Sequence, residues 1–201
     1  CSGRLWLPFS AYSGFPPVLE FFDRSPYELD FEEVGSPTTV IDVDRQYVYE
    51  GPDTNSYVLY PNFSGVTLVS YTVAAWVKLD TYSSEICRSD DGVTTFVVRF
   101  TSGADELQIL HDSVEVATLS GVALSTWTHI AVTYDQSTEV LRIYADGEQE
   151  GIALDVPAFA SFTGMRAFAM NGRGDDLRVY NRAKSAEFIR TLYNKTNNPL
   201  F

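Results

Sequence analysis

Carboxylates recur at every second position of the segment Glu28-Leu29-Asp30-Phe31-Glu32. Side chains alternate between the two faces of a strand, so Glu28, Asp30 and Glu32 are expected to share one face. Paired carboxylates hydrolyse glycosidic bonds, one acting as nucleophile and the other as acid/base. The retaining mechanism needs the pair about 5–5.5 Å apart, and an i, i+4 spacing on a strand is longer than this unless a twist or bulge shortens it.

Two adjacent aspartates, Asp175 and Asp176, form the second candidate site. Calcium prefers hard oxygen ligands, which adjacent carboxylates and loop carbonyls could supply. The alternative is that these carboxylates pair with Arg178 or Arg182, or face water at the edge of a sheet. The sequence leaves both interpretations open.

The remaining motifs favour structural roles. Arg173-Gly174-Asp175 matches the tripeptide that integrins bind, but Asp175 is expected to open a strand rather than lie on an exposed loop, so we attribute the match to chance. Neither His129, within an expected strand, nor His111, at the end of one, has neighbouring zinc ligands in the sequence. Trp76 and Trp127 are predicted to be buried core residues, with sugar stacking as the alternative. The sequence contains no nucleophile elbow, phosphate-binding loop or dinucleotide fingerprint.

The composition is that of an acidic, aromatic-rich globular chain. It has 201 residues and a formal net charge of −13, with 13 Phe, 12 Tyr and 3 Trp. Such a charge repels nucleic acid and anionic membranes, and no apolar run is long enough to span a bilayer, so we expect neither a nucleic-acid partner nor membrane insertion. Cys1 and Cys87 leave three states open: a disulfide, two free thiols, or a lipid on Cys1.

Short runs rich in β-branched and aromatic residues, separated by turn residues, predict an all-β fold. The expected strands are 28–33, 38–43, 46–50, 56–60, 71–79, 93–101, 105–111, 113–119, 127–135, 138–146, 148–154, 164–171 and 175–181. Asp146-Gly147 is the preferred two-residue hairpin turn, because both positions need positive φ. One helix is expected near the end, with Ser185 as N-cap and an apolar stripe over 188–193. Residues 1–27 hold four prolines and no sustained period, so we interpret them as an N-terminal arm before a domain at 28–201.

Three segments carry a family resemblance. They are YTVAAWVK at 71–78, TWTHIAVTYD at 126–135 followed by LRIYADG at 141–147, and GDDLRVYNRA at 174–183. Their order and spacing resemble those of concanavalin A-like laminin-G domains, whose relatives include pentraxins, and the resemblance covers about residues 28–193. It implies a jelly-roll sandwich of two antiparallel sheets with one short C-terminal helix.

This resemblance implies a non-catalytic module that binds a glycan or an extracellular protein, outside the cell or at its surface, within a larger multidomain protein. It also implies a calcium ion that joins the last strand to the first, held by Asp175 or Asp176 together with Glu32. Hydrolases of the laminarinase type share this sandwich and carry a Glu-x-Asp-x-Glu strand. They imply an alternative with Glu28 as nucleophile, Glu32 as acid/base and Asp30 tuning both. Their motif lies mid-chain, whereas here it opens the sandwich, so we predict no enzymatic activity. A purely structural spacer is the third alternative.

Overall fold

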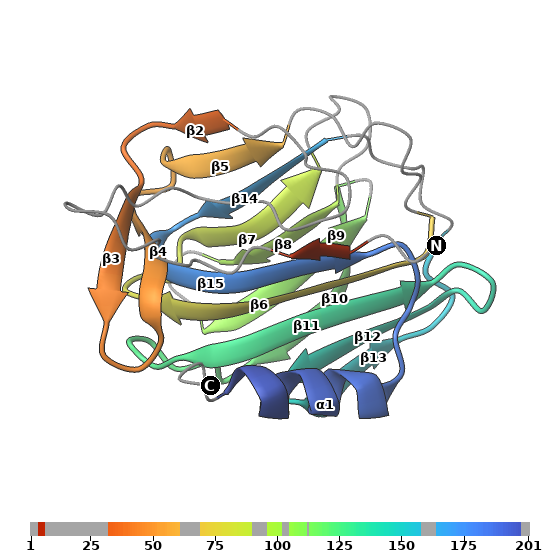
Figure 1. Ribbon diagram of the computed structural model, residues 1–201. Coiled ribbons are helices and arrows are strands. Elements are labelled where there is room, and N and C mark those ends of the chain that lie inside the picture. Colours follow the sequence, from red (N-terminus) through yellow and green to blue (C-terminus); the bar gives the residue numbers. More distant parts are fainter. Residues whose placement is uncertain are drawn as a thin grey trace.

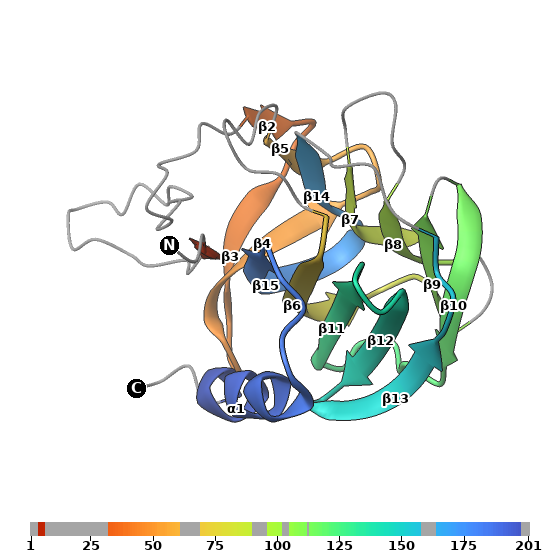
Figure 2. The ribbon, with the colours of Figure 1, turned by 90° about the vertical axis from the view of Figure 1, so that its right-hand side faces the viewer.

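Two antiparallel β-sheets face each other in the computed structural model, which describes residues 4–6, 32–60, 69–89, 96–101, 105–111, 113–157 and 164–197 (Figure 1). A view turned by 90° shows the single helix on the outside of one sheet (Figure 2). The predicted all-β jelly-roll sandwich with one short C-terminal helix is confirmed. The described helix is too short to cross a membrane.

The eight-stranded sheet carries the helix. Its order is β13 (Glu148–Ala153), β12 (Val140–Ala145), β11 (Thr128–Asp135), β6 (Tyr71–Leu79), β15 (Asn171–Tyr180), β4 (Gln46–Pro52) and β3 (Thr38–Asp42), with β1 (Arg4–Trp6) paired to β15. The seven-stranded sheet runs β10 (Val114–Ser120), β9 (Glu106–His111), β8 (Val97–Phe100), β7 (Ser84–Ser89), β14 (Met165–Ala169), β5 (Tyr57–Tyr60) and β2 (Glu32–Val34). Apart from β1, the predicted arm 1–27 lies outside the described residues.

The core lies between the sheets and is filled by alternate residues of each strand. The eight-stranded sheet contributes Val73, Ala75 and Val77 from β6, and the seven-stranded sheet contributes Ile86 and Val98, all buried. In β6 the opposite positions, Ala74 and Trp76, are also buried, at 1% and 2% exposure. This strand is therefore covered on both faces, which explains its nearly continuous apolar sequence.

Helix α1 (Ala186–Thr196) covers the outer face of β6, β11 and β12. Ser185 caps it, because its hydroxyl accepts a hydrogen bond from the Phe188 amide, as predicted. Ile189 and Leu192 pack on Ala74, with Ala131 and Tyr144 completing this second cluster. The amphipathic stripe of the helix therefore turns one outer sheet face into a buried layer.

The Asp146-Gly147 hairpin is confirmed, since both residues have positive φ, 48° and 82°. Strand β7 was not predicted, because its outward positions are Glu85 and Arg88 and a bulge interrupts its pairing with β8 between Glu85 and Cys87. Cys87 is buried and free of a disulfide, and burial raises the pKa of its thiol. The expected turn at 101–103 lies largely outside the described residues.

Gly174 is a glycine because an aromatic ring occupies the space of a side chain. A Cβ there would lie 2.5 Å from Cδ1 and Cε1 of the buried Phe168. We expect Gly174→Ala to lower the free energy of unfolding by about 1–3 kcal/mol, because the added methyl group would overpack the core. Gly151→Ala is the matched control: its Cβ would meet Ile143 at an ordinary 3.5 Å, so stability should stay within about 0.5 kcal/mol. Urea unfolding measures both, and equal losses would contradict the packing argument.

Candidate binding site

A cavity of about 450 Å³ lies on the outer side of the eight-stranded sheet, where the end of helix α1 meets the turn between β3 and β4. Its wall combines aromatic rings with charges of both signs. The lining residues are Asp44, Arg45, Trp76, Lys78, Ser125, Thr126, Trp127, Asp146, Tyr193 and Asn197.

Arg45 fixes the floor of this cavity. Its Nε donates to Asp175 Oδ2 at 2.7 Å, and its Nη1 donates to the Thr196 carbonyl at 3.1 Å. The carbonyls of the last helical turn lack partners within the helix, so a guanidinium there both caps the helix and faces the negative end of its dipole. The same guanidinium lies over the rings of Trp76 and Trp127, 4.2 and 5.4 Å from their centroids. Arg45 is 5% exposed, and its contacts hold the β3–β4 turn, strand β15 and the end of helix α1 together.

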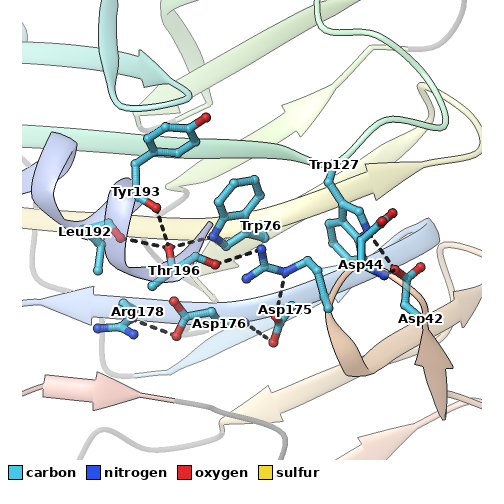
Figure 3. A network of polar contacts seen from close by, with 11 residues as sticks. Asp42, Asp44, Trp76, Trp127, Asp175, Asp176, Arg178, Leu192, Tyr193 and Thr196 are labelled. Atoms are coloured by element: carbon cyan, nitrogen blue, oxygen red, sulfur yellow. Dashed lines mark hydrogen bonds and ion pairs between the residues drawn. The ribbon is translucent and has the colours of Figure 1, made fainter. Parts of the chain in front are cut away.

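A β-bulge in β15 places Asp175 opposite Arg45. The pairing of β15 with β6 shifts register between Asp175 and Arg178, and Asp176 adopts φ 50°. In a regular strand Asp176 would point into the core; here Leu177 is fully buried in the core instead, and Asp176 pairs with Arg178 at 2.9 Å. Figure 3 shows both carboxylates within the polar network.

Asp42 orients Trp127, which lines the cavity. It accepts the Trp127 indole N–H at 3.1 Å, the Asp44 amide at 2.9 Å and Arg173 Nη1 at 2.7 Å. Burial works to raise the pKa of Asp42, but these hydrogen bonds, with Lys78 nearby, lower it to about 2. The carboxylate therefore stays ionised and fixes the orientation of the Trp127 ring (Figure 3).

The two tryptophans of the site have different environments. Trp76 is 2% exposed, donates its indole N–H to Thr196 Oγ1 at 2.8 Å and lies against Tyr193 and His129. Trp127 is only half-buried, because it lies in the loop just before β11 rather than within the strand. The prediction that both are buried residues of the core is therefore wrong for Trp127, and Trp76 is buried beneath the helix rather than between the sheets.

Two exposed carboxylates complete the wall. Asp146 lies at the β12–β13 hairpin, where its Oδ1 accepts the backbone N–H of His129 at 2.9 Å. Asp44 lies in the β3–β4 turn, next to Arg45. Arg45, Asp44 and Lys78 could not be recognised as site residues from the sequence, because no motif links the β3–β4 turn to residues more than 100 positions away.

Comparison with known proteins identifies the family. The family model described as concanavalin A-like lectin/glucanases superfamily, of the laminin G type, matches residues 52–190. This chain belongs to that superfamily. No curated protein sequence matches this concanavalin A-like domain significantly.

Solved structures share its fold at low sequence identity. The binding domain of botulinum neurotoxin DC, in complex with rat synaptotagmin II, has a TM-score of 0.74 at 14% identity, covering 96% of this chain and 51% of that one. Domain 4 of AbnA, an extracellular family 43 arabinanase from Geobacillus stearothermophilus, was solved in complex with arabinotriose. It has a TM-score of 0.70 at 14% sequence identity, and the match covers 94% of this chain and 99% of that one. Botulinum neurotoxin type C, whose cell entry depends on two ganglioside molecules, has a TM-score of 0.71 at 12% sequence identity. The match covers 97% of this chain and 51% of that one. The chain thus spans about half of the neurotoxin chains it matches.

The structure does not bring the predicted metal ligands together. Asp175 and Asp176 lie on the eight-stranded sheet and are ion-paired with Arg45 and Arg178, whereas Glu32 is exposed on β2, at the edge of the seven-stranded sheet. No group of three or more His, Cys, Asp or Glu side chains that could hold a metal occurs within the described part of the chain. Calcium at these residues stays a prediction.

The two other sequence motifs are the carboxylate strand and the Arg173-Gly174-Asp175 tripeptide. Glu28 and Asp30 lie outside the described residues, so only Glu32 of the carboxylate strand can be placed. Gly174 and Asp175 are buried in the middle of β15, and Arg173 pairs with Asp42 and Glu50. An integrin has no access to this tripeptide in the folded domain.

The calcium prediction is tested by thermal unfolding. An ion that binds only the folded chain stabilises it by about 2.7 kcal/mol at a hundredfold excess over its Kd, so melting should occur at a higher temperature in calcium than in chelator. Asp176→Asn should remove this rise if the predicted ligand is correct. Equal melting temperatures in the two buffers would contradict a calcium site.

His129 gives the domain a pH dependence. Burial, and then the nearby Arg45 and Arg178, lower the pKa of its imidazole from 6.5 to about 3. Between these values the unfolded chain binds a proton that the folded chain does not, so the free energy of unfolding falls as the pH falls below 6.5. The expected slope for this group is about 1.4 kcal/mol per pH unit.

The measurement is urea unfolding of wild type and His129→Gln at pH 7 and pH 4.5. The wild type should lose about 2–3 kcal/mol more than the variant over this interval. His111, whose pKa burial lowers to about 4, acts in the same direction in both proteins. Asp175 acts in the opposite direction, because burial raises its pKa to about 6. Parallel losses in wild type and variant would show that His129 does not titrate as described.

Proposed function

We propose that this domain is a non-catalytic carbohydrate-binding module that holds a sugar against the half-exposed ring of Trp127. The observation that carries the proposal is this ring, fixed by Asp42 at the wall of a cavity of about 450 Å³. Ligand cavities typically combine an apolar surface with a few placed polar groups, and a sugar offers an apolar face of C–H groups to an aromatic ring.

The charged groups around Trp127 fit the hydroxyls of a sugar. Asp44 and Asp146 supply acceptors, whereas Lys78 and the Asn197 amide supply donors. Sugar hydroxyls both donate and accept, so they can use carboxylate and ammonium groups together. Charge-assisted hydrogen bonds of this kind are about twice as strong as neutral ones, which gives orientation to a ligand that stacking alone would leave free to rotate.

Hydrogen bonds within the fold orient Arg45 and Trp127 in the cavity wall. Arg45 is bonded to Asp175 and to the helix end, and Trp127 is bonded to Asp42, so the wall loses little conformational freedom on binding. Loop residues supply the contacts, while the sheet and helix hold them. This favours recognition over a purely structural spacer.

The relatives support the same class of ligand. Domain 4 of the arabinanase is described with arabinotriose and neurotoxin type C with gangliosides, although neurotoxin DC also binds a protein, synaptotagmin II. We infer an extracellular or cell-surface module within a larger protein. A protein ligand and a hydrolase using Glu28, Asp30 and Glu32 stay as alternatives; the half-buried ring of Trp127 at the cavity wall favours the sugar over both.

The test is a glycan array, followed by calorimetry on the best oligosaccharide. Trp127→Ala should weaken binding at least about tenfold, because truncating a central aromatic contact typically costs 2 kcal/mol or more. Trp127→Phe retains a ring and should keep most of the affinity, although it loses the hydrogen bond to Asp42. Oligosaccharides recovered after incubation should have their original length, in keeping with a non-catalytic domain.

Stability separates binding from packing. Trp76→Ala should lower the free energy of unfolding by about 3–5 kcal/mol, because Trp76 is 2% exposed. Trp127→Ala should cost clearly less, since the ring is only half-buried. Unchanged sugar binding in a folded Trp127→Ala protein would overturn the proposal, as would an array without any ligand.

A further inference from the structure

Three arginines lie on the outer face of the seven-stranded sheet, whereas Trp127 directly precedes β11 of the eight-stranded sheet. Arg166, Arg88 and Arg99 project from β14, β7 and β8, which are adjacent in the seven-stranded sheet (Figure 1). Arg88 lies directly opposite Arg166 in the pairing of β7 with β14. Like charges at opposed positions destabilise a sheet unless an anion lies between them.

Among the described residues, Glu85 is the one carboxylate that is paired with these cations. Glu85 lies 3.3 Å from Arg88 Nη1 and 3.0 Å from Arg166 Nη2. Arg99 instead directs both Nε and Nη2 at the amide oxygen of Gln108, at 3.3 and 3.2 Å. Gln108 in turn donates to Glu115. Within the described residues Arg99 therefore has a neutral acceptor and forms no ion pair of its own.

A cavity of about 440 Å³ lies beside two of these arginines, Arg99 and Arg166. Arg99, Arg166 and Glu85 line it together with hydroxyls of Thr54, Ser83 and Thr101. Three buried polar atoms of its wall have no hydrogen-bond partner among the described residues: Arg166 Nε, Thr101 Oγ1 and Glu85 Oε2. Buried polar groups are nearly always hydrogen-bonded in folded proteins, so the polar groups of this wall are incompletely satisfied within the described part of the fold. The guanidinium of Arg99, which lines the cavity and has only a neutral acceptor there, is the group available to an anion.

We propose that this cavity is a second binding site, which takes the carboxylate of an acidic sugar such as a hexuronate or a sialate. A planar carboxylate matches the two-pronged guanidinium of Arg99. Thr54, Ser83 and Glu85 then face the sugar hydroxyls. Phe100, an apolar residue of the wall, is 2% exposed, so the cavity offers no apolar pocket of the kind that anchors a peptide.

The experiment uses the full chain and two matched ligand pairs. A galacturonate tetramer is compared with its methyl ester, and sialyllactose with lactose, by calorimetry at low salt. At least one acidic member should bind about tenfold or more tightly than its neutral partner, because the carboxylate supplies the hydrogen bonds to charged donors. This binding should weaken in 0.5 M salt.

The variants place the site. Arg99→Gln should weaken acidic binding about tenfold or more, while Arg99→Lys, which keeps the charge but not the fork, should lie between it and wild type. Arg190→Gln is the control for net charge, because Arg190 is 60% exposed on α1 and pairs only with Glu148 among the described residues. Trp127→Ala should leave acidic binding intact, so this site and the Trp127 site fail independently.

Three results would overturn the proposal. One is equal binding of acidic and neutral partners in both pairs. Another is equal loss of acidic binding in Arg99→Gln and Arg190→Gln, which would indicate bulk charge alone. The third is displacement of the acidic sugar by an acidic peptide or by sulfate at the same concentration, which would assign the cavity to anions in general.

Discussion

The buried ion pair between Arg45 and Asp175 is the contact on which the outer layer of the eight-stranded sheet depends. Their side chains are 4% and 9% exposed, so removing either one would leave the other charge buried and unpaired, at a cost of about 3–5 kcal/mol. The pair joins the β3–β4 turn to the bulge of β15, and Arg45 continues to the end of helix α1. Three segments distant in sequence thereby meet at one guanidinium.

This junction determines which tryptophan is available to a ligand. Trp76 contacts Arg45, Tyr193 and His129 and is almost fully buried. Arg45 also lies over the ring of Trp127, but part of that ring stays exposed. The hydrogen bond to Asp42 fixes the orientation of that ring. The same network that stabilises the helix therefore presents the aromatic surface of the candidate site.

The sequence predicted the elements better than the contacts between them. The hairpin at Asp146-Gly147 and the cap at Ser185 were found because a few adjacent residues dictate each of them. Strand β7 was missed because its bulge and outward charges break the apolar alternation. Local patterns report which residues alternate, but they do not report which sheet a strand joins, so the separation of Glu32 from Asp175 could not be foreseen.

The arginines of the two outer faces differ in what they have left to bind. Arg45 donates to a carboxylate and a helix carbonyl and faces two rings, so its charge is neutralised within the fold. Among the described residues, Arg99 donates to an amide oxygen and to no carboxylate, and the buried Nε of Arg166 has no acceptor. Both arginines belong to a chain of net charge −13, in which carboxylates outnumber the basic groups. A guanidinium that has only a neutral partner beside a cavity keeps its charge available to an anionic ligand, which is the basis of the proposed second site.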